Sequence, residues 1–251
     1  MKTFNYYVLS EAGASAERQE TGFVDAVNDA VKKTSGPITL KTKDATIKNV
    51  TKAEKYSGRQ ASGSEPYTDV QLFTKSGVLN LSMKGPSAPS LAGGGLRGIE
   101  EIIPGLAARF FKSAYANLIK KGIKAGDKVP DTYGKLNDRD KKLLVIGNKA
   151  MGGPIDYMYI GPMDVRSSLK ISNKQGVLEV NGSCIEALKY ANSKNLYFRL
   201  RARRADQTFD PSVKNKDGSP KIYGKSPSKG DSAGRLAITD KPAGNRDLIT
   251  F

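Results

Sequence analysis

The 251-residue sequence contains no histidine and a single cysteine, and these absences remove several classes of chemistry. Without histidine, the chain cannot use imidazole as a general acid or base, as the activator of a nucleophile or as a metal ligand. One cysteine, Cys184, can form neither an internal disulfide nor a zinc cluster by itself. We expect it to be a small buried side chain. Catalysis would have to rest on carboxylates, lysines, hydroxyls and an oxygen-liganded metal such as magnesium.

Long apolar runs are also absent. No window approaches the roughly 18 uninterrupted apolar residues of a membrane-spanning helix. The most apolar stretch, 102–111, is short and contains Pro104 and Arg109. The amino terminus lacks the apolar core of a signal peptide. We therefore expect a protein that is neither secreted nor bound to a membrane.

Positive charge is in large excess, with a formal net charge of +16 and a pI near 9.7. Such an excess favours a polyanionic partner, because lysine and arginine neutralise phosphates and release counterions. The charge is uneven: residues 61–111 carry four basic and four acidic residues, whereas 112–150 carry ten and four. A neutral block between basic ones suits a carboxylate site approached by DNA, although basic blocks are also common as solvated faces.

The apolar pattern predicts alternating helices and strands. An amphipathic helix is expected over 17–33, where Phe23, Val27, Ala30 and Val31 recur at helical spacing. Other expected elements are strands within 38–50, a helix pair over 99–121, strands at 141–146, 155–160 and 196–204, and a hairpin of 165–172 with 176–181.

The segment 67–85 predicts a β-hairpin, because two alternating runs flank a Thr-Lys-Ser-Gly turn. The period of two in a strand places Asp69, Gln71, Asn80, Ser82 and Lys84 on one polar side. The hairpin thus sets an acid on one strand beside a lysine on the next.

Asp69 together with Ser82-Met83-Lys84 resembles the metal site of the PD-(D/E)xK nuclease superfamily, whose fold is that of restriction endonucleases. The resemblance implies that Asp69 is a Mg²⁺ ligand, that the Met83 carbonyl is a second ligand, and that Lys84 positions the attacking water. A magnesium ion would lower the pKa of that water and neutralise charge on the phosphate.

Ser82 departs from the superfamily pattern, which has Asp or Glu at this position. Its neutral hydroxyl would serve as a hydrogen-bonding substitute and leave the site one charge short. The resemblance implies that an acid from the first helix compensates, and Glu20 is the first choice, with Glu17 as the fallback. Two alternatives stay open: a plain exposed ribbon, and a fold that kept the shape and lost the chemistry.

A second candidate nucleic-acid contact is the arginine-rich run 197–204. Strand alternation places Arg199, Arg201 and Arg203 on one side, which would form a ridge for phosphates. A charged sheet edge that resists aggregation is the competing interpretation. Arg97, at the end of the glycine-rich segment 87–97, is a further candidate, and a plain connection before a helix is equally compatible with that segment.

The first twelve residues resemble the amino termini of proteins from large contractile-tailed bacteriophages. Leu9 and Glu11 before a small residue are similar to the cleavage sites of their prohead proteases. The resemblance implies a phage protein in the host cytoplasm or the virion, with cleavage after Glu11 as one prospect.

Taken together, the sequence predicts an α/β fold with a restriction-endonuclease-like mixed sheet flanked by helices. The domain is expected over residues 1–205, followed by an irregular basic extension over 206–251. The predicted function is Mg²⁺-dependent cleavage of DNA. The alternative is a non-enzymatic head, neck or tail component of a phage that sits against DNA or other structural proteins.

Overall fold

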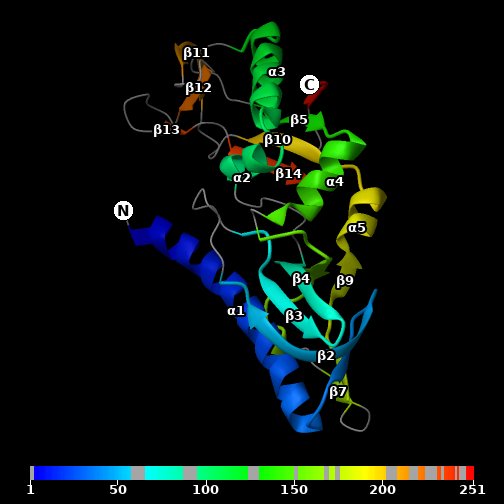
Figure 1. Ribbon diagram of the computed structural model, residues 1–251. Coiled ribbons are helices and arrows are strands. Elements are labelled where there is room, and N and C mark those ends of the chain that lie inside the picture. The colour runs from blue at the N-terminus through cyan, green and yellow to red at the C-terminus, as the bar shows by residue number, and fades with distance from the viewer. Residues whose placement is uncertain are drawn as a thin grey trace. The chain divides into compact units, whose positions relative to one another are not determined.

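The computed structural model (Figure 1) is of an α/β protein. The residues it describes are 3–57, 66–86, 95–123, 130–149, 152–166, 170–172, 176–201, 208–214, 220–223, 231–232, 235–240, 242 and 247–251. Contacts divide the chain into two compact units: residues 1–89 with 145–190, and residues 90–144 with 191–251.

The first unit is built on an eight-stranded mixed sheet in the order β7-β8-β1-β2-β3-β4-β6-β9. The β1–β8 and β4–β6 pairs are parallel and the remaining pairs are antiparallel. The strands are β1 (Ile38–Lys41), β2 (Thr46–Lys55), β3 (Val70–Thr74), β4 (Gly77–Lys84), β6 (Tyr157–Ile160), β7 (Lys170–Ser172), β8 (Val177–Glu179) and β9 (Ser183–Glu186).

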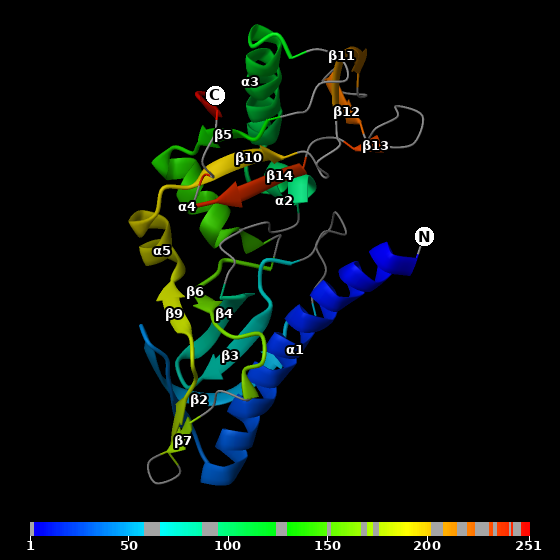
Figure 2. The same cartoon turned by 180° about the vertical axis from the view of Figure 1, so that it is seen from behind.

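A long helix, α1 (Thr3–Thr34), runs along this sheet in both views (Figures 1 and 2). It contains the helix expected over 17–33, and its apolar face is buried. Phe23 and Val27 pack into one core with Leu72 and Leu81 of the hairpin strands. The Phe23 and Tyr159 rings lie 5.2 Å apart between centroids. Burying this face, at about 1.5–3 kcal/mol for each large side chain, holds α1 against the strands.

Gln19 also points from α1 into the protein and is buried. Its side-chain amide donates to the carbonyl oxygens of Lys84 (3.1 Å), Gly161 (3.0 Å) and Pro162 (3.2 Å). These carbonyls lie at the ends of β4 and β6. A single side chain therefore joins the helix to the place where the two parallel strands finish.

The hairpin predicted over 67–85 is confirmed, with Val70 opposite Leu81 and Thr74 opposite Gly77. The alternation of faces is confirmed except at Ser82, which belongs to the predicted polar side but is buried. Val70, Leu72, Leu81 and Met83 are in the core, whereas Gln71, Asn80 and Lys84 are half-buried. The second hairpin is found as the antiparallel pair β7–β8.

The sheet curls so that the turn after β1 meets the segment before β9. The Lys43 N–H donates to the Gly182 carbonyl (2.9 Å), and the Cys184 N–H donates to the Thr42 hydroxyl (3.0 Å). Gly182 has φ of +138°, and a Cβ there would come within 2.8 Å of the Tyr159 ring. Only glycine therefore fits this closure. Cys184 is buried, as expected, and burial raises the pKa of its thiol to about 12.

The second unit contains a four-stranded mixed sheet in the order β14-β10-β5-β15 and a three-stranded antiparallel sheet, β11-β12-β13. The rings of Phe110, Phe198 and Phe251 meet beside Gly134, where a Cβ would lie 2.6 Å from the Phe251 ring. Elements of this part are α2 (Gly95–Ile102), α3 (Leu106–Lys120), β5 (Thr132–Lys135), β10 (Tyr197–Arg201), β11 (Thr208–Lys214), β12 (Pro220–Tyr223), β13 (Asp231–Ser232), β14 (Arg235–Thr239) and β15 (Asp247–Ile249).

One expectation about secondary structure is wrong. Residues 141–146 belong to the helix α4 (Asp138–Ile146), not to a strand. The Asn137 side-chain oxygen accepts from the Asp140 N–H (2.8 Å), which caps this helix at its start. The short helix α5 (Ala187–Ser193) lies in a segment for which no element was predicted.

The irregular extension expected over 206–251 is also not what the described segments contain. There β14 pairs along its length with β10, and β15 pairs with β5. The alternation of Leu236 and Ile238, which lie opposite Leu200 and Phe198, supplies the strand signal within an otherwise polar sequence. None of the described helices has the length and apolarity to cross a membrane.

Replacing Gln19 by leucine tests the junction between α1 and the ends of β4 and β6. The Gln19→Leu variant should lose about 1–3 kcal/mol of unfolding free energy, because three carbonyl oxygens lose their hydrogen bonds from the Gln19 amide, although that of Lys84 keeps another donor, the Gly161 N–H. Urea unfolding followed by circular dichroism measures the loss. Thr21→Leu, at an exposed position of the same helix, is the control and should unfold like the wild type. Equal stability of both variants would contradict a bridging role for Gln19.

Candidate functional site

Asp69 lies directly before β3, at the end of the hairpin ladder. Its N–H donates to the Leu81 carbonyl (2.9 Å), and its carboxylate Oδ2 accepts from the Met83 N–H (2.5 Å). The side chain thus continues the ladder one position beyond the last backbone pair. In an extended strand the N–H and C=O of one residue point to the same side. The Met83 carbonyl is therefore directed toward the side on which the Asp69 carboxylate lies.

Lys84 and Ser82 approach the same carboxylate oxygen from β4. The Lys84 Nζ is 3.8 Å from Asp69 Oδ2, and the Ser82 hydroxyl donates to this oxygen at 3.3 Å. The side chains of Asp69 and Lys84 are both 23% exposed, so the pair is reachable but half-sheltered. The structure therefore brings together the acid, the hydroxyl and the lysine that the sequence selected.

Glu20 contributes a second acid from α1. Its Oε2 lies 3.1 Å from Lys55 Nζ, at the end of β2. Burial raises the pKa of Glu20, and the negative charge of Asp69 raises it further, while Lys55 opposes both effects. The negative charge of Asp69 therefore disfavours ionisation of Glu20. Glu17, the fallback, is more exposed and lies 3.8 Å from Lys55.

The remaining polar residues of the hairpin form a separate pair. The Gln71 side-chain amide donates to the Asn80 side-chain oxygen (2.9 Å), and the Asn80 N–H donates to the Asp156 carboxylate (2.7 Å). These contacts extend the polar face of the hairpin away from Asp69. They stabilise the strands and do not include Asp69, whose contacts lie at the end of the sheet.

The donor set at Asp69 and Glu20 is compatible with a hard divalent cation. Mg²⁺ prefers carboxylate and carbonyl oxygens and keeps several waters, so two acids and the Met83 carbonyl would suffice as protein ligands. Two half-sheltered acids that repel each other gain from a cation placed between them. Within the described residues no three side chains of Asp, Glu or Cys gather as a metal-binding group.

The predicted arginine contacts fall partly outside the described residues. Arg199 lies on β10, where its guanidinium binds the Asp131 carboxylate (Nε, 3.1 Å) and stacks over the Tyr133 ring at 5.7 Å. Arg201 and Arg97 lie on β10 and α2, but their side chains are outside the described residues, as is all of Arg203. The ridge itself stays a prediction, with Arg199 already engaged by an acid.

The predicted cleavage site, Glu11, falls within α1, and its side chain is outside the described residues.

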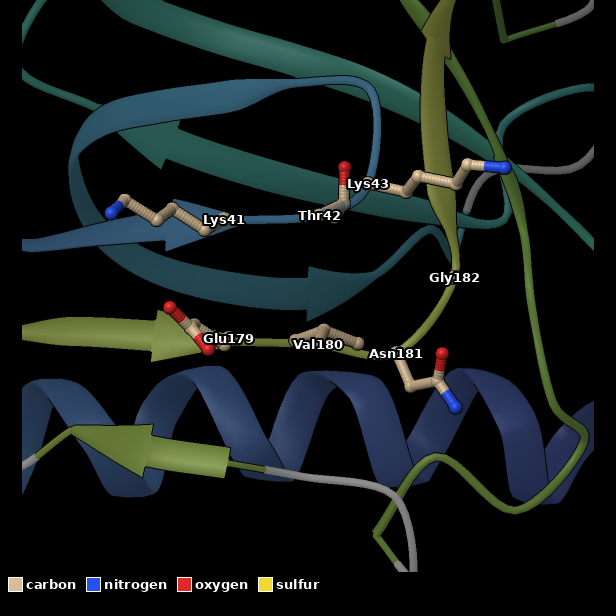
Figure 3. Close-up of a pocket in the computed structure, with 7 residues that line it drawn as sticks. All are labelled: Lys41, Thr42, Lys43, Glu179, Val180, Asn181 and Gly182. Atoms are coloured by element: carbon tan, nitrogen blue, oxygen red, sulfur yellow. The ribbon is translucent and has the colours of Figure 1, made fainter.

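A cleft of about 490 Å³ lies where the curled sheet closes (Figure 3). It is lined by Lys41, Thr42, Lys43, Glu179, Val180, Asn181 and Gly182. The side chains of Lys41 and Lys43 extend in opposite directions in this view. The Thr42 hydroxyl is used within the protein, since it accepts from the Ala45 and Cys184 N–H groups. The cleft therefore lacks the converging polar groups found at Asp69.

Comparisons with protein-family models, curated proteins and solved structures found no match.

Sequence reasoning missed two residues at the site, Gln19 and Lys55. Gln19 looked like one polar residue among several in the helix, and its burial depends on where α1 crosses β4. Lys55 ends a strand whose pairing with β3 places it opposite Val70, next to Asp69. The spacing of Glu17 and Glu20 on one helical face was the available signal for a cation there.

Introducing an acid at Ser82 tests whether this is a metal site. Ser82→Asp would set a second carboxylate beside Asp69. In EDTA, the like charges should lower the unfolding free energy by about 1–3 kcal/mol. With MnCl₂ the variant should recover this stability and bind Mn²⁺ at least about tenfold more tightly than the wild type, because each added ligand charge strengthens the site. Differential scanning fluorimetry and calorimetric titration measure the two effects. Ser82→Asn is the uncharged control, and equal Mn²⁺ affinity in the two variants would contradict the assignment.

Glu20 should make stability depend on pH in a metal-free buffer. Its pKa is raised in the folded state, so the unfolded chain loses this proton first as the pH rises. Ionisation of Glu20 therefore lowers the unfolding free energy as the pH rises from about 4.5, its pKa in the unfolded chain, to above its pKa in the folded protein. Below about pH 4.5 Glu20 is protonated in both states and has no such effect. We expect Glu20→Gln to be more stable than the wild type at pH 8, and the difference to vanish near pH 4. Urea unfolding across this range measures it, and a difference that grows toward low pH would refute the assignment.

Proposed function

We propose that the protein cleaves DNA phosphodiester bonds with the help of Mg²⁺ bound at Asp69 and Glu20. The observation that carries this proposal is the gathering of Ser82, Met83 and Lys84 around one oxygen of the Asp69 carboxylate. The acid at the end of one strand and the lysine on the neighbouring strand are not part of the apolar core. Their arrangement suits the holding of a cation and a water molecule.

The topology of the first unit supports a restriction-endonuclease-like fold. A helix precedes the sheet, Asp69 lies directly before β3, Lys84 ends the neighbouring antiparallel strand β4, and β6 pairs with β4 in parallel. Parallel strands require a crossover connection. Here the crossover is the long segment between Lys84 and Tyr157, which contains α2, α3, β5 and α4. The site lies where β4 and β6 end.

Each residue has a distinct role in the proposed hydrolysis. Asp69, Glu20 and the Met83 carbonyl would hold Mg²⁺, which would supply an activated water and neutralise phosphate charge. Lys84 donates to the attacking water and orients it, and Ser82 fixes the Asp69 carboxylate. The oxygen of that water bonds to phosphorus and the water releases a proton to solvent, while the bond from phosphorus to a sugar oxygen breaks and the departing oxygen takes a proton from solvent.

The net charge of +16 supports DNA as the substrate class. Neutralising phosphates favours binding to any duplex, and it does not depend on sequence. The excess of basic residues is largest outside the block that contains Asp69 and Lys84. DNA would then be held by basic residues outside this block while the few acids face one phosphate.

Plasmid nicking by matched variants tests the activity. Wild-type protein with supercoiled plasmid and MgCl₂ should give open-circular and linear DNA. Asp69→Asn keeps an acceptor for the Met83 N–H but removes the charge, and Lys84→Met removes the ammonium. Both variants should lose about a hundredfold or more of the rate, as expected for loss of a metal ligand or a water-positioning group.

Asp138→Asn and Lys52→Met are the controls, because both side chains are largely exposed and lie outside the Asp69 group. They should nick plasmid at the wild-type rate. Cleavage that survives Asp69→Asn and Lys84→Met would point to a contaminating nuclease.

An intact plasmid with the wild-type protein would favour the second candidate function, a non-enzymatic virion component that contacts DNA. One observation favours this alternative. Ser82 offers a neutral hydroxyl to Asp69 at 3.3 Å where a nuclease site gains from a third acid.

A further inference from the structure

A second lysine, Lys55, stands beside the proposed metal site. It ends β2 opposite Val70, the first residue of β3. The next residue, Tyr56, donates its N–H to the Asp69 carbonyl (3.0 Å). The backbone next to Lys55 is therefore hydrogen-bonded to Asp69.

The side chain of Lys55 is held by the acids of α1. Its Nζ lies 3.1 Å from Glu20 Oε2 and 3.8 Å from Glu17 Oε1, and 38% of the side chain is exposed. A lysine ammonium is a mobile point charge on a flexible stem, with three donors that can change partners. Lys55 thus has access both to the acids and to solvent.

The charges at this end of the sheet form two acid–lysine pairs, Asp69 with Lys84 and Glu20 with Lys55. A divalent cation between the two acids supplies the same total charge as the two ammonium groups. Binding of the cation therefore weakens the hold of each acid on its lysine. Lys84 then has the attacking water as a partner, whereas Lys55 keeps only the longer contact with the exposed Glu17, at 3.8 Å, and its positive charge becomes available at the rim of the site.

We propose that Lys55 is the resident counter-ion of the metal site and, once the metal is bound, the ligand of a phosphate oxygen of the DNA. This inference rests on the proposed function and adds a substrate-binding residue to it. It predicts two opposite effects of one substitution: removing Lys55 strengthens metal binding and weakens DNA binding.

Lys52 provides a matched control on the same strand. It pairs with Glu54 and lies over the Phe73 ring at 5.9 Å from its centroid. Lys52→Met removes the same charge and the same side-chain atoms as Lys55→Met. Neither change affects a buried residue, so both variants should fold, and thermal unfolding checks this.

The test measures metal and DNA binding separately. Calorimetric titration with MnCl₂ should show about two- to fivefold tighter binding by Lys55→Met than by the wild type, because one partly exposed ion pair no longer competes. Anisotropy of a labelled duplex in CaCl₂, followed over salt concentration, should show weaker binding and a salt slope smaller by about one. In EDTA the slope should change little, because Glu20 then holds Lys55. Lys55→Arg should retain the slope in CaCl₂.

Two results would overturn the role of Lys55 alone: Lys55→Met behaving like Lys52→Met in both titrations, or losing DNA affinity equally in CaCl₂ and in EDTA. A wild-type protein that neither binds Mn²⁺ nor nicks plasmid would instead overturn the proposed function, and the role of Lys55 with it.

Discussion

The packing of α1 against the hairpin strands is the contact on which the candidate site depends. Phe23 and Val27 bury the helix against Leu72 and Leu81, and this fixes both the rotation and the height of the helix over the sheet. Two consecutive residues then face different surroundings. Gln19 turns inward to the ends of β4 and β6, and Glu20 turns outward to Lys55. One apolar contact thereby places one polar group that joins the strand ends and one acid that pairs with Lys55.

The acids Asp69 and Glu20 at the end of the sheet reduce the stability of the fold, and the same charges favour the binding of a cation. Burial and the charge of Asp69 both raise the pKa of Glu20, so ionisation of this residue opposes folding. Protein surfaces usually avoid such like-charged acids. Residues kept in an unfavourable state are often those that function requires. The two lysines reduce the repulsion without removing the acids, and Ser82 limits it by adding no third charge.

The hairpin and its faces were predictable from the sequence because both signals are local. Strand alternation over 67–85 and the turn at Gly77 require no knowledge of other elements. The segment 141–146 was misread because an apolar run of Leu, Leu, Val and Ile fits a strand or a buried helix. The cap at Asn137, three residues before Asp140, was the distinguishing feature. β14 and β15 were missed because their partners, β10 and β5, lie far away along the chain. Gln19 and Lys55 were missed for the same reason, since their roles arise from packing between distant elements.

The parallel pairing of β4 with β6 sets the order in which the site can form. The two strands are neighbours in space, yet the whole segment 85–156 separates them along the chain. During synthesis, α1 and the hairpin leave the ribosome well before β6 exists. Two of the three carbonyls that Gln19 binds, those of Gly161 and Pro162, come later still. The acid and the lysine can meet early, and α1 can pack on the hairpin, but two of the three hydrogen bonds of Gln19 form only after this long segment has brought β6 beside β4, which is a slow step in folding.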